Sequence, residues 1–313
     1  MKTKPKVVCL MGPTASGKTQ LAVALHQQFA SDIISVDSVM VYRGMDIGTA
    51  KPSATLLAQA PHQLIDVRDP TQPYCVANFC QDAQTFIQAS LAAQRIPLLV
   101  GGSMLYFHAL QTGLADMSAA DTNVRRQLEH QANEQGWAAL YTQLTQVDPV
   151  AAANINPNDR QRIQRALEIY HVTGKPMSQH WQQPLPPADY EFINLALIAS
   201  DRAILHQRIE QRVQQMLADG LIAEVNGLFE RGDLDLALPA LRSVGYRQVW
   251  LYLQGAYDVQ TMQDKITAAT RQLAKRQLTW LRRWPNLQII DALLPLSERL
   301  AAVKKILYRL SVI

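Results

Sequence analysis

Short apolar runs alternate with helical stripes along the first hundred residues of the chain. The runs predicted as buried strands cover residues 7–11, 32–36, 63–67 and 96–100. Residues 19–29 and 76–94 instead repeat apolar side chains at the three- and four-residue spacing of an amphipathic helix. Strands and helices that alternate in this way form a parallel sheet with helices on both faces. The pattern therefore predicts an α/β core.

The pattern changes after Gly113. From residue 118 to about residue 183 it predicts only helices, separated by turn-forming residues. A proline-rich linker is predicted at residues 182–189, and residues 191–199 then predict a strand that rejoins the sheet, followed by further helices. We expect a first part of the core at residues 1–115, an all-helical insertion at 116–188, and a second, mainly helical part of the core at 189–313.

Composition narrows the class of protein. With 313 residues, 48% apolar and 18% charged, the chain is globular and can form a large core. Its net charge of +4 is compatible with a nucleic-acid partner without being evidence for one. No run approaches the roughly 18 apolar residues of a membrane span, and the basic start is too short for a signal peptide. The three cysteines and seven histidines lack the spacing of a disulfide framework or a zinc site. We expect a cytoplasmic protein without a structural metal.

A phosphate-binding loop is predicted between the first strand and the first helix. The lysine of this pattern reaches phosphate oxygens, the following hydroxyl faces a magnesium ion, and backbone N–H groups at the helix N-terminus surround the anion. A glycine turn that merely connects strand to helix is the alternative. The residues that match the pattern G-x-x-x-x-G-K-[ST] are Gly12, Pro13, Thr14, Ala15, Ser16, Gly17, Lys18 and Thr19.

Polar side chains follow two other predicted strands. Asp37 and Ser38 come directly after residues 32–36, and Gly101, Gly102 and Ser103 come after residues 96–100. In an open α/β sheet, ligands bind beyond the carboxyl ends of the strands, so these residues are candidates for the same site as the loop. Asp37 could equally be a turn-forming residue with no chemical role.

Basic residues gather in the predicted insertion and near the end of the chain. Arginines stand at 125, 126, 160, 162 and 165, and the stretch 265–283 holds six cations and no acid, with Trp280 among them. Such runs are often solvated helix faces. Cations mixed with aromatic side chains near a phosphate site also fit a nucleic-acid surface.

These segments together resemble the bacterial tRNA dimethylallyltransferase (tRNA isopentenyltransferase) family, from about residue 7 to residue 284. The phosphate loop alone is common to many nucleotide enzymes, whereas the ordered set is specific. Two positions depart from the usual pattern: Met40 stands where glutamine is common, and Ser103 where threonine is common. The matching segments are 12–19, 37–38 with Tyr42, 44–52, 61–62, 101–106, 159–168, 173–175, 208–225, 244–248 and 274–280.

The resemblance implies transfer of a dimethylallyl group from its diphosphate to N6 of the adenosine immediately 3′ of the anticodon, with release of diphosphate. Lys18, Thr19 with Mg²⁺, and Arg212 would hold the diphosphate, and Ser103 would lie near the acceptor. Asp37 would take the proton from the adenine amino group. We expect a monomer that grips the anticodon stem-loop. The residues that match the family's tRNA contacts are Asp37, Ser38, Val39, Met40, Ser103, Arg125, Gln161, Arg162, Ile163, Gln164, Arg165, Arg242, Ser243, Val244, Gly245, Tyr246 and Arg247.

Two other functions remain open at this point. A small-molecule kinase would bind ATP at the same loop and use Asp37 to activate a hydroxyl acceptor, but it would leave half of the chain without a role. An RNA-binding protein switched by a nucleotide would show nucleotide-dependent RNA affinity and would form no covalent product.

Overall fold

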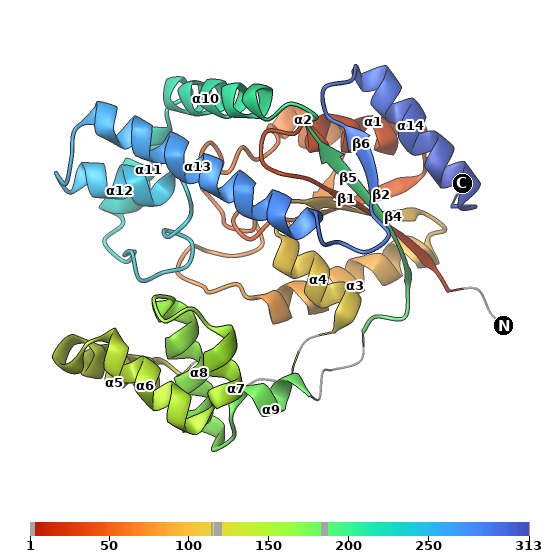
Figure 1. Cartoon of the computed structure of the whole chain (residues 1–313). Coiled ribbons are helices and arrows are strands. Elements are labelled where there is room, and N and C mark those ends of the chain that lie inside the picture. The colour runs from red at the N-terminus through yellow and green to blue at the C-terminus, as the bar shows by residue number, and fades with distance from the viewer. Residues whose placement is uncertain (1–3, 114, 116–120, 183–186, 313) are drawn as a thin grey trace. The chain divides into compact units, whose positions relative to one another are not determined.

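The computed structural model describes residues 4–113, 115, 121–182 and 187–312 (Figure 1). The chain divides into two compact units: residues 1–111 together with 189–313, and residues 112–188. The division falls at the end of a helix, Met104–Thr112, four residues before the boundary expected at residue 116. Part of the predicted linker, residues 183–186, lies outside the described residues.

The first unit is built on a six-stranded sheet. Its order is β3-β2-β4-β1-β5-β6, and every neighbouring pair runs in parallel. The predicted α/β class with a parallel sheet is therefore confirmed. In chain order the strands are β1 (Lys6–Met11), β2 (Ser31–Val36), β3 (His62–Gln63), β4 (Ile96–Gly101), β5 (Glu191–Ile198) and β6 (Gln288–Asp291).

Helices cover both faces of this sheet (Figure 1). On one face, α1 (Lys18–Gln28) and α14 (Leu296–Arg309) pack in one apolar cluster with side chains of β1 and β5. On the other face lie α3 (Val76–Ala92) and α4 (Met104–Thr112). Because successive side chains of a strand point to opposite faces, continuous apolar runs are what a strand covered on both sides requires.

The remaining helices of this unit are α2 (Ala54–Gln59), α10 (Arg202–Ala218), α11 (Leu221–Glu230), α12 (Tyr246–Leu253) and α13 (Val259–Leu281). Leu205 and Ile209 of α10 pack against Ala274 of α13 in a separate apolar cluster. Tyr246 and Arg247, expected in a turn between helices, form the first turn of α12.

Two parts of the sheet differ from the sequence prediction. The third strand is only two residues long, so the prediction of a strand at residues 63–67 is wrong. Leu64 and Asp66 take φ values of 66° and 57°, a left-handed backbone that cannot continue a strand ladder. The last strand, β6, and the helix after it were not predicted at all. This strand has four residues, too few for its alternation to stand out.

The second unit contains five helices and no named strand among its described residues. Its helices are α5 (Thr122–Gln135), α6 (Trp137–Val147), α7 (Pro149–Asn154), α8 (Arg160–Thr173) and α9 (Met177–Trp181). Asp121, Asp148 and Asp159 cap three of them by accepting backbone N–H bonds. Its buried side chains form a core of their own, which includes Leu140, Leu144 and Leu167. Across the described residues of both units, no helix combines the length and apolar character needed to cross a membrane.

Candidate active site

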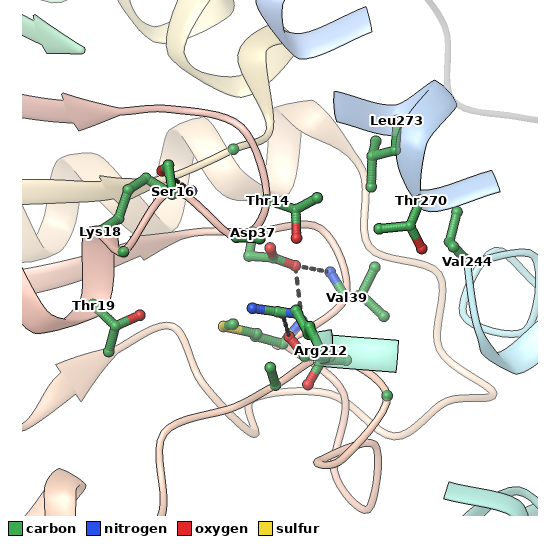
Figure 2. A pocket seen from close by; sticks show the side chains of 18 of the residues that line it. Thr14, Ser16, Lys18, Thr19, Asp37, Val39, Arg212, Val244, Thr270 and Leu273 are labelled. Atoms are coloured by element: carbon green, nitrogen blue, oxygen red, sulfur yellow. Dashed lines mark hydrogen bonds between the residues drawn. The ribbon is translucent and has the colours of Figure 1, made fainter. Parts of the chain in front are cut away.

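The candidate site lies at the carboxyl edge of the sheet in the first unit. Strands β2, β4 and β1 are neighbours, so the segments that follow them meet at one edge. A cavity of about 570 Å³ opens there, lined by residues 14–20 of the phosphate loop, Asp37, Gly101 and Gly102. Figure 2 shows Asp37, Lys18, Thr19 and Arg212 around this space. The structure thus brings together most of the predicted diphosphate-binding residues.

The phosphate loop has the geometry of an anion-binding site. Gly17 caps α1 with a φ of 85°, which glycine adopts without strain, and no side chain caps the helix. The first turn of α1 carries no acidic residue, and Ser16 is completely buried beneath the loop. The N–H groups and the positive end of the helix dipole therefore face the cavity without a competing anion from this turn.

The Lys18 side chain folds back onto its own loop. Its Nζ donates to the carbonyl oxygen of Pro13 at 2.7 Å and lies 3.5 Å from Ser16 Oγ. Burial and, to a smaller extent, the charge of Arg212 lower the pKa of Lys18 from 10.5 to about 7, with Asp37 partly opposing the shift. Lys18 is therefore close to its titration midpoint at neutral pH, and an anion in the cavity would favour its charged form.

Asp37 shapes a turn and also faces the cavity. Its Oδ1 accepts hydrogen bonds from the backbone N–H groups of Val39 at 2.8 Å and Met40 at 3.1 Å. Its Oδ2 accepts no hydrogen bond from any described residue. The turn-forming role and the chemical role are thus compatible, because each uses a different carboxylate oxygen.

Ser38 and Ser103 link two strand ends. Ser103 Oγ accepts from the Ser38 backbone N–H at 3.1 Å and lies 3.4 Å from the Ser38 hydroxyl. Neither serine is among the described residues that line the cavity, whereas Val39 and Met40 are. The Met40 sulfur lies 3.9 Å from Ser35 Oγ. The position usually occupied by glutamine in the family thus presents a thioether to the cavity.

Positive charge dominates the lining of the cavity. Lys18, Arg208, Arg212 and Arg299 line it, and among the described lining residues Asp37 is the single carboxylate. Arg212 Nη2 donates to the Thr49 carbonyl at 3.3 Å. Burial lowers the pKa of Arg212, and Asp37 partly opposes this shift. Such a surplus of cations, one of them buried and three partly buried, favours a multiply charged anion.

Gln277 joins two of the loops and was given no role by the sequence analysis. Its side chain, on α13, accepts from the Thr14 N–H at 2.9 Å and donates to the Gly102 carbonyl at 2.9 Å. Glycine at position 102 allows this approach, because a Cβ there would lie 2.4 Å from Gln277 Nε2 and would displace the amide. Gln277 lies on the buried stripe of its helix with Thr270 and Leu281, and a polar residue on an apolar stripe is the signal that points to it.

Glu224 anchors the loop after the second strand. Its carboxylate accepts from the N–H groups of Asp46, Ile47 and Gly48 at 2.7–3.1 Å and from the Tyr246 hydroxyl. Tyr246 is completely buried by these contacts. The side chain therefore supports the loop, and the contact of residue 246 with tRNA stays a prediction that concerns its backbone alone.

The other residues of the segment 242–247 have different environments. Ser243, Val244 and Gly245 line the cavity. Arg242 and Arg247 are exposed, and Arg242 Nε donates to the Leu236 carbonyl at 3.0 Å. This segment thus presents its middle to the cavity and its arginines to solvent.

In the second unit, the predicted arginines fall into two groups. Arg125 and Arg165 both bind the completely buried Glu168, at 3.0 and 2.9 Å. Burial would raise the pKa of Glu168, but the hydrogen bonds from the two arginines outweigh it and hold this pKa below its usual range. Arg162 instead is 69% exposed and is 3.4 Å from Asp159.

The neighbours of these arginines on α8 also differ. The Ile163 side chain is completely buried in the core of the second unit, so the contact with tRNA stays a prediction that concerns its backbone alone. Gln164 donates to the Arg125 carbonyl at 3.3 Å and to Glu129 at 3.1 Å. Gln161 is exposed. Of the predicted tRNA contacts at residues 161–165, only Gln161 and Arg162 are therefore exposed.

Aromatic and basic side chains gather on the last part of α13. Trp280 is 39% exposed and lies 6.4 Å from Trp284 and 5.5 Å from His108, between ring centres. Lys275 and Arg276, also on α13, are exposed. Exposed rings beside cations are suited to bases and phosphates of a nucleic acid.

The residues present fit magnesium only through the phosphate loop. No group of three or more His, Cys, Asp or Glu residues that could hold a metal ion occurs among the described residues. The Thr19 hydroxyl lines the cavity. In a phosphate loop of this pattern the hydroxyl after the lysine is the group that faces Mg²⁺, so Thr19 fits this role together with phosphate oxygens of a ligand.

Comparisons with known proteins agree with the resemblance. A model of the IPP transferase family matches residues 40–284. A tRNA dimethylallyltransferase 2 from Hahella chejuensis is 54% identical over 308 residues, covering 93% of this chain and 92% of that protein. The crystal structure of a tRNA isopentenylpyrophosphate transferase from Bacillus halodurans is 37% identical with a TM-score of 0.71, over 97% of this chain and 96% of that one. A eukaryotic dimethylallyltransferase acting on tRNA is 25% identical with a TM-score of 0.78, over 97% and 78%. The chain belongs to the IPP transferase family.

Proposed function

We propose that this chain transfers a dimethylallyl group from dimethylallyl diphosphate to N6 of the adenosine immediately 3′ of the anticodon in tRNA. The observation that carries the proposal is a cavity that joins a phosphate-binding loop to the carboxylate of Asp37. In the reaction, a C–N bond forms to N6, the C–O bond to diphosphate breaks, and N6 loses a proton.

The phosphate loop and its neighbouring cations hold the leaving group. Negative charge grows on the diphosphate as the C–O bond breaks, so cations placed beforehand lower the barrier. Lys18 and Arg212 contribute this charge, and Arg212 can grip two phosphate oxygens at once. Mg²⁺, held by Thr19 and the phosphates, would add further positive charge when bound.

Asp37 is the proposed base. An adenine amino group is a weak nucleophile and must lose its proton as the new bond forms. The Oδ2 atom of Asp37 has no hydrogen-bond donor among the described residues, while the Oδ1 atom is fixed by Val39 and Met40. The carboxylate is therefore held in place with one oxygen available for the proton. General-base catalysis of this kind is typically worth roughly 10²–10⁴-fold in rate.

The tRNA partner is gripped by several exposed basic residues. We assign this role to Arg162 in the second unit, to Arg242 and Arg247, and to the aromatic and basic end of α13. The adenosine must leave the anticodon loop to enter the cavity, which requires a grip on the surrounding RNA. We further propose that the protein acts as a monomer, since a single chain supplies every residue assigned here. We place it in the cytoplasm, where its proposed tRNA substrate is found.

One experiment tests the proposal. The protein is incubated with tRNA, dimethylallyl diphosphate and Mg²⁺, and the digested nucleosides are analysed by mass spectrometry. We expect one N6-dimethylallyl adenosine for each tRNA modified, and diphosphate in equal amount. A phosphorylated small molecule formed with ATP would instead identify a kinase. Nucleotide-dependent tRNA binding without a covalent product would identify a switched RNA-binding protein.

A further inference from the structure

Arg299 is a buried cation that the fold does not neutralise. It lies on the inner stripe of α14 with Val303 and Leu307, which pack against α1. Arg299 is 7% exposed, and its Nε has no hydrogen-bond partner among the described residues. None of its side-chain nitrogens forms an ion pair with a described carboxylate. Burying a guanidinium in this way is costly unless something else compensates its charge.

The guanidinium of Arg299 points into the phosphate-binding part of the cavity. It lines the cavity, and its Nη1 is 3.0 Å from the place that a Cβ on Gly17 would take. Gly17 is the residue before α1, so Arg299 is at the positive end of that helix. Burial lowers the pKa of Arg299, and the neighbouring Arg208 lowers it further. The guanidinium groups of Arg299 and Arg208 and the positive end of α1 thus lie next to one another in the free protein.

The order of the strands explains how these cations come together. Lys18 follows β1, Arg208 and Arg212 lie on the helix after β5, and Arg299 lies on the helix after β6. The strands β1, β5 and β6 are consecutive in the sheet. Arg208 Nη1 is held by the Ala292 carbonyl, at 3.2 Å, in the segment between β6 and α14. Three neighbouring strands therefore each deliver positive charge to one edge of the cavity.

We infer that Arg299 is a further binding residue for the diphosphate of the donor, contacting a phosphate group on the Gly17 side of the loop with Arg208 beside it. The inference rests on the proposed function and adds a residue beyond position 284, where the family match ends. Arg212 contacts the Thr49 carbonyl and lies within electrostatic reach of Asp37, so it contacts the diphosphate from the side of the cavity nearer the acceptor. Arg299 and Arg208 contact it from the side of Gly17.

The test is the binding of inorganic diphosphate by calorimetry, which needs neither tRNA nor turnover. Arg299→Met keeps a long apolar side chain and removes the charge. Lys305→Met, at an exposed position of the same helix, is the matched control. We expect Arg299→Met to lower the affinity for diphosphate at least about tenfold, as the removal of a charge-assisted hydrogen bond does. Lys305→Met should bind diphosphate with the affinity of the wild type. Dimethylallyl diphosphate should show a raised KM, with tRNA affinity unchanged.

Thermal unfolding separates binding from a structural role. Without ligand, Arg299→Met should unfold at the wild-type temperature or above it, because an uncompensated buried charge has been removed. Addition of diphosphate should then raise the unfolding temperature less than it does for the wild type. A lower unfolding temperature with unchanged diphosphate affinity would overturn the inference, since Arg299 would then only support the fold.

The remaining outcomes distinguish the inference from the proposed function. Weaker ATP binding with unchanged diphosphate and dimethylallyl diphosphate affinity would assign Arg299 to a nucleotide and overturn the inference. If the wild type modified tRNA while Arg299→Met bound diphosphate normally, the inference alone would fail. If the wild type modified no tRNA but Arg299→Met still failed to bind diphosphate, the phosphate-binding role would stand and the proposed transfer would fail.

Discussion

At the scale of single residues, Asp37 illustrates how one side chain can support a turn and still perform chemistry. Its Oδ1 atom receives two backbone N–H bonds, which a carboxamide oxygen could receive equally well. Only a carboxylate can take up a proton. A change from carboxylate to carboxamide therefore separates the two roles, because it keeps the turn and removes the base.

We predict that Asp37→Asn lowers single-turnover transfer on saturating tRNA by roughly 10²–10⁴-fold. Donor and tRNA should bind within a few-fold of the wild type, because the amide oxygen keeps the two backbone hydrogen bonds of the turn. The NH2 group that replaces Oδ2 cannot accept a proton. Rapid-quench measurement of modified tRNA provides the rate. A rate within about threefold of the wild type would mean that the base is another group.

Lys18 provides a prediction on pH. Its pKa is about 7 in the free protein, and a bound diphosphate raises it again because opposite charges favour the ionised form. Above pH 7, Lys18 is therefore largely deprotonated in the free protein and protonated in the complex with diphosphate. Binding of diphosphate should take up close to one proton near pH 8, and affinity should fall as pH rises above 7.

Calorimetry in buffers with different ionisation enthalpies measures this proton uptake. Lys18→Met is the control, because the protonation of diphosphate itself contributes equally to both proteins. In the free wild type, the free energy of unfolding should also rise between about pH 7 and 10.5, where the unfolded chain holds the proton that the folded chain lacks. Equal proton uptake by wild type and Lys18→Met would contradict the assignment.

At the scale of elements, the structure separates arginines that the sequence placed together. Glu168 lies on the inner face of α8 and binds Arg125 and Arg165, which therefore contribute to the stability of the second unit. Arg162, on the outer face of the same helix, is mostly exposed. Only the second kind of position is available to RNA without a cost to the fold.

We predict that Glu168→Gln lowers the free energy of unfolding by about 2–3 kcal/mol, because it removes the charge from two buried hydrogen-bonded contacts. Its pKa lies below the usual value, so this stability is present above the unfolded pKa and is lost as pH falls through the folded pKa. Denaturant unfolding at neutral and acidic pH measures both effects. Unchanged stability at neutral pH would show that the arginines do not need this carboxylate.

Arg162→Ala, on the same helix, should give the opposite pattern. Its stability should stay within about 0.5 kcal/mol of the wild type, as for most exposed positions. Its tRNA affinity should fall, and the magnitude of the salt slope should decrease by about 0.7–0.9 for each phosphate that the variant no longer neutralises. If the affinity for tRNA fell while the salt slope stayed as in the wild type, the loss would come from a changed protein surface and not from a lost charge.

Four of the six strands of the sheet were predicted from the sequence. Strands β1, β2, β4 and β5 were predicted to within about two residues, because their apolar runs end at glycine or aspartate turns. The third strand was misjudged because its hydrophobic pattern continues through two left-handed residues, which no apolar periodicity reveals. Pattern predicts burial, whereas pairing also depends on backbone angles.

The candidate site was predictable where it followed a motif and not where it depended on distant segments. The phosphate loop and Asp37 were found from local pattern. Gln277 and Arg299 enter the site from helices more than 250 residues after Gly12 in the sequence, on stripes that otherwise pack apolar side chains. Tyr246 and Ile163 match the family's motifs, but their side chains are completely buried. A motif does not reveal which of its side chains are buried.

At the scale of the whole molecule, the two units have separate cores. The residues of the second unit pack in a cluster around Leu140 and Leu167, and the residues that line the cavity all belong to the first unit. Diphosphate binding should therefore depend on the first unit alone. The grip on tRNA, in contrast, is proposed to use residues of both.

We predict that replacing residues 112–188 with a short Gly–Ser linker separates these two activities. Inorganic diphosphate should bind within about threefold of the wild type, because every cation that lines the cavity remains. Affinity for tRNA should fall at least about tenfold at physiological salt, because Arg162 and its neighbours are removed. Calorimetry with diphosphate and filter binding with labelled tRNA measure the two affinities on the same preparation. Retained tRNA affinity would place the RNA grip in the first unit, on Arg242, Arg247 and the end of α13. Loss of diphosphate binding would mean that the phosphate loop needs the second unit to keep its shape, although the two cores are separate.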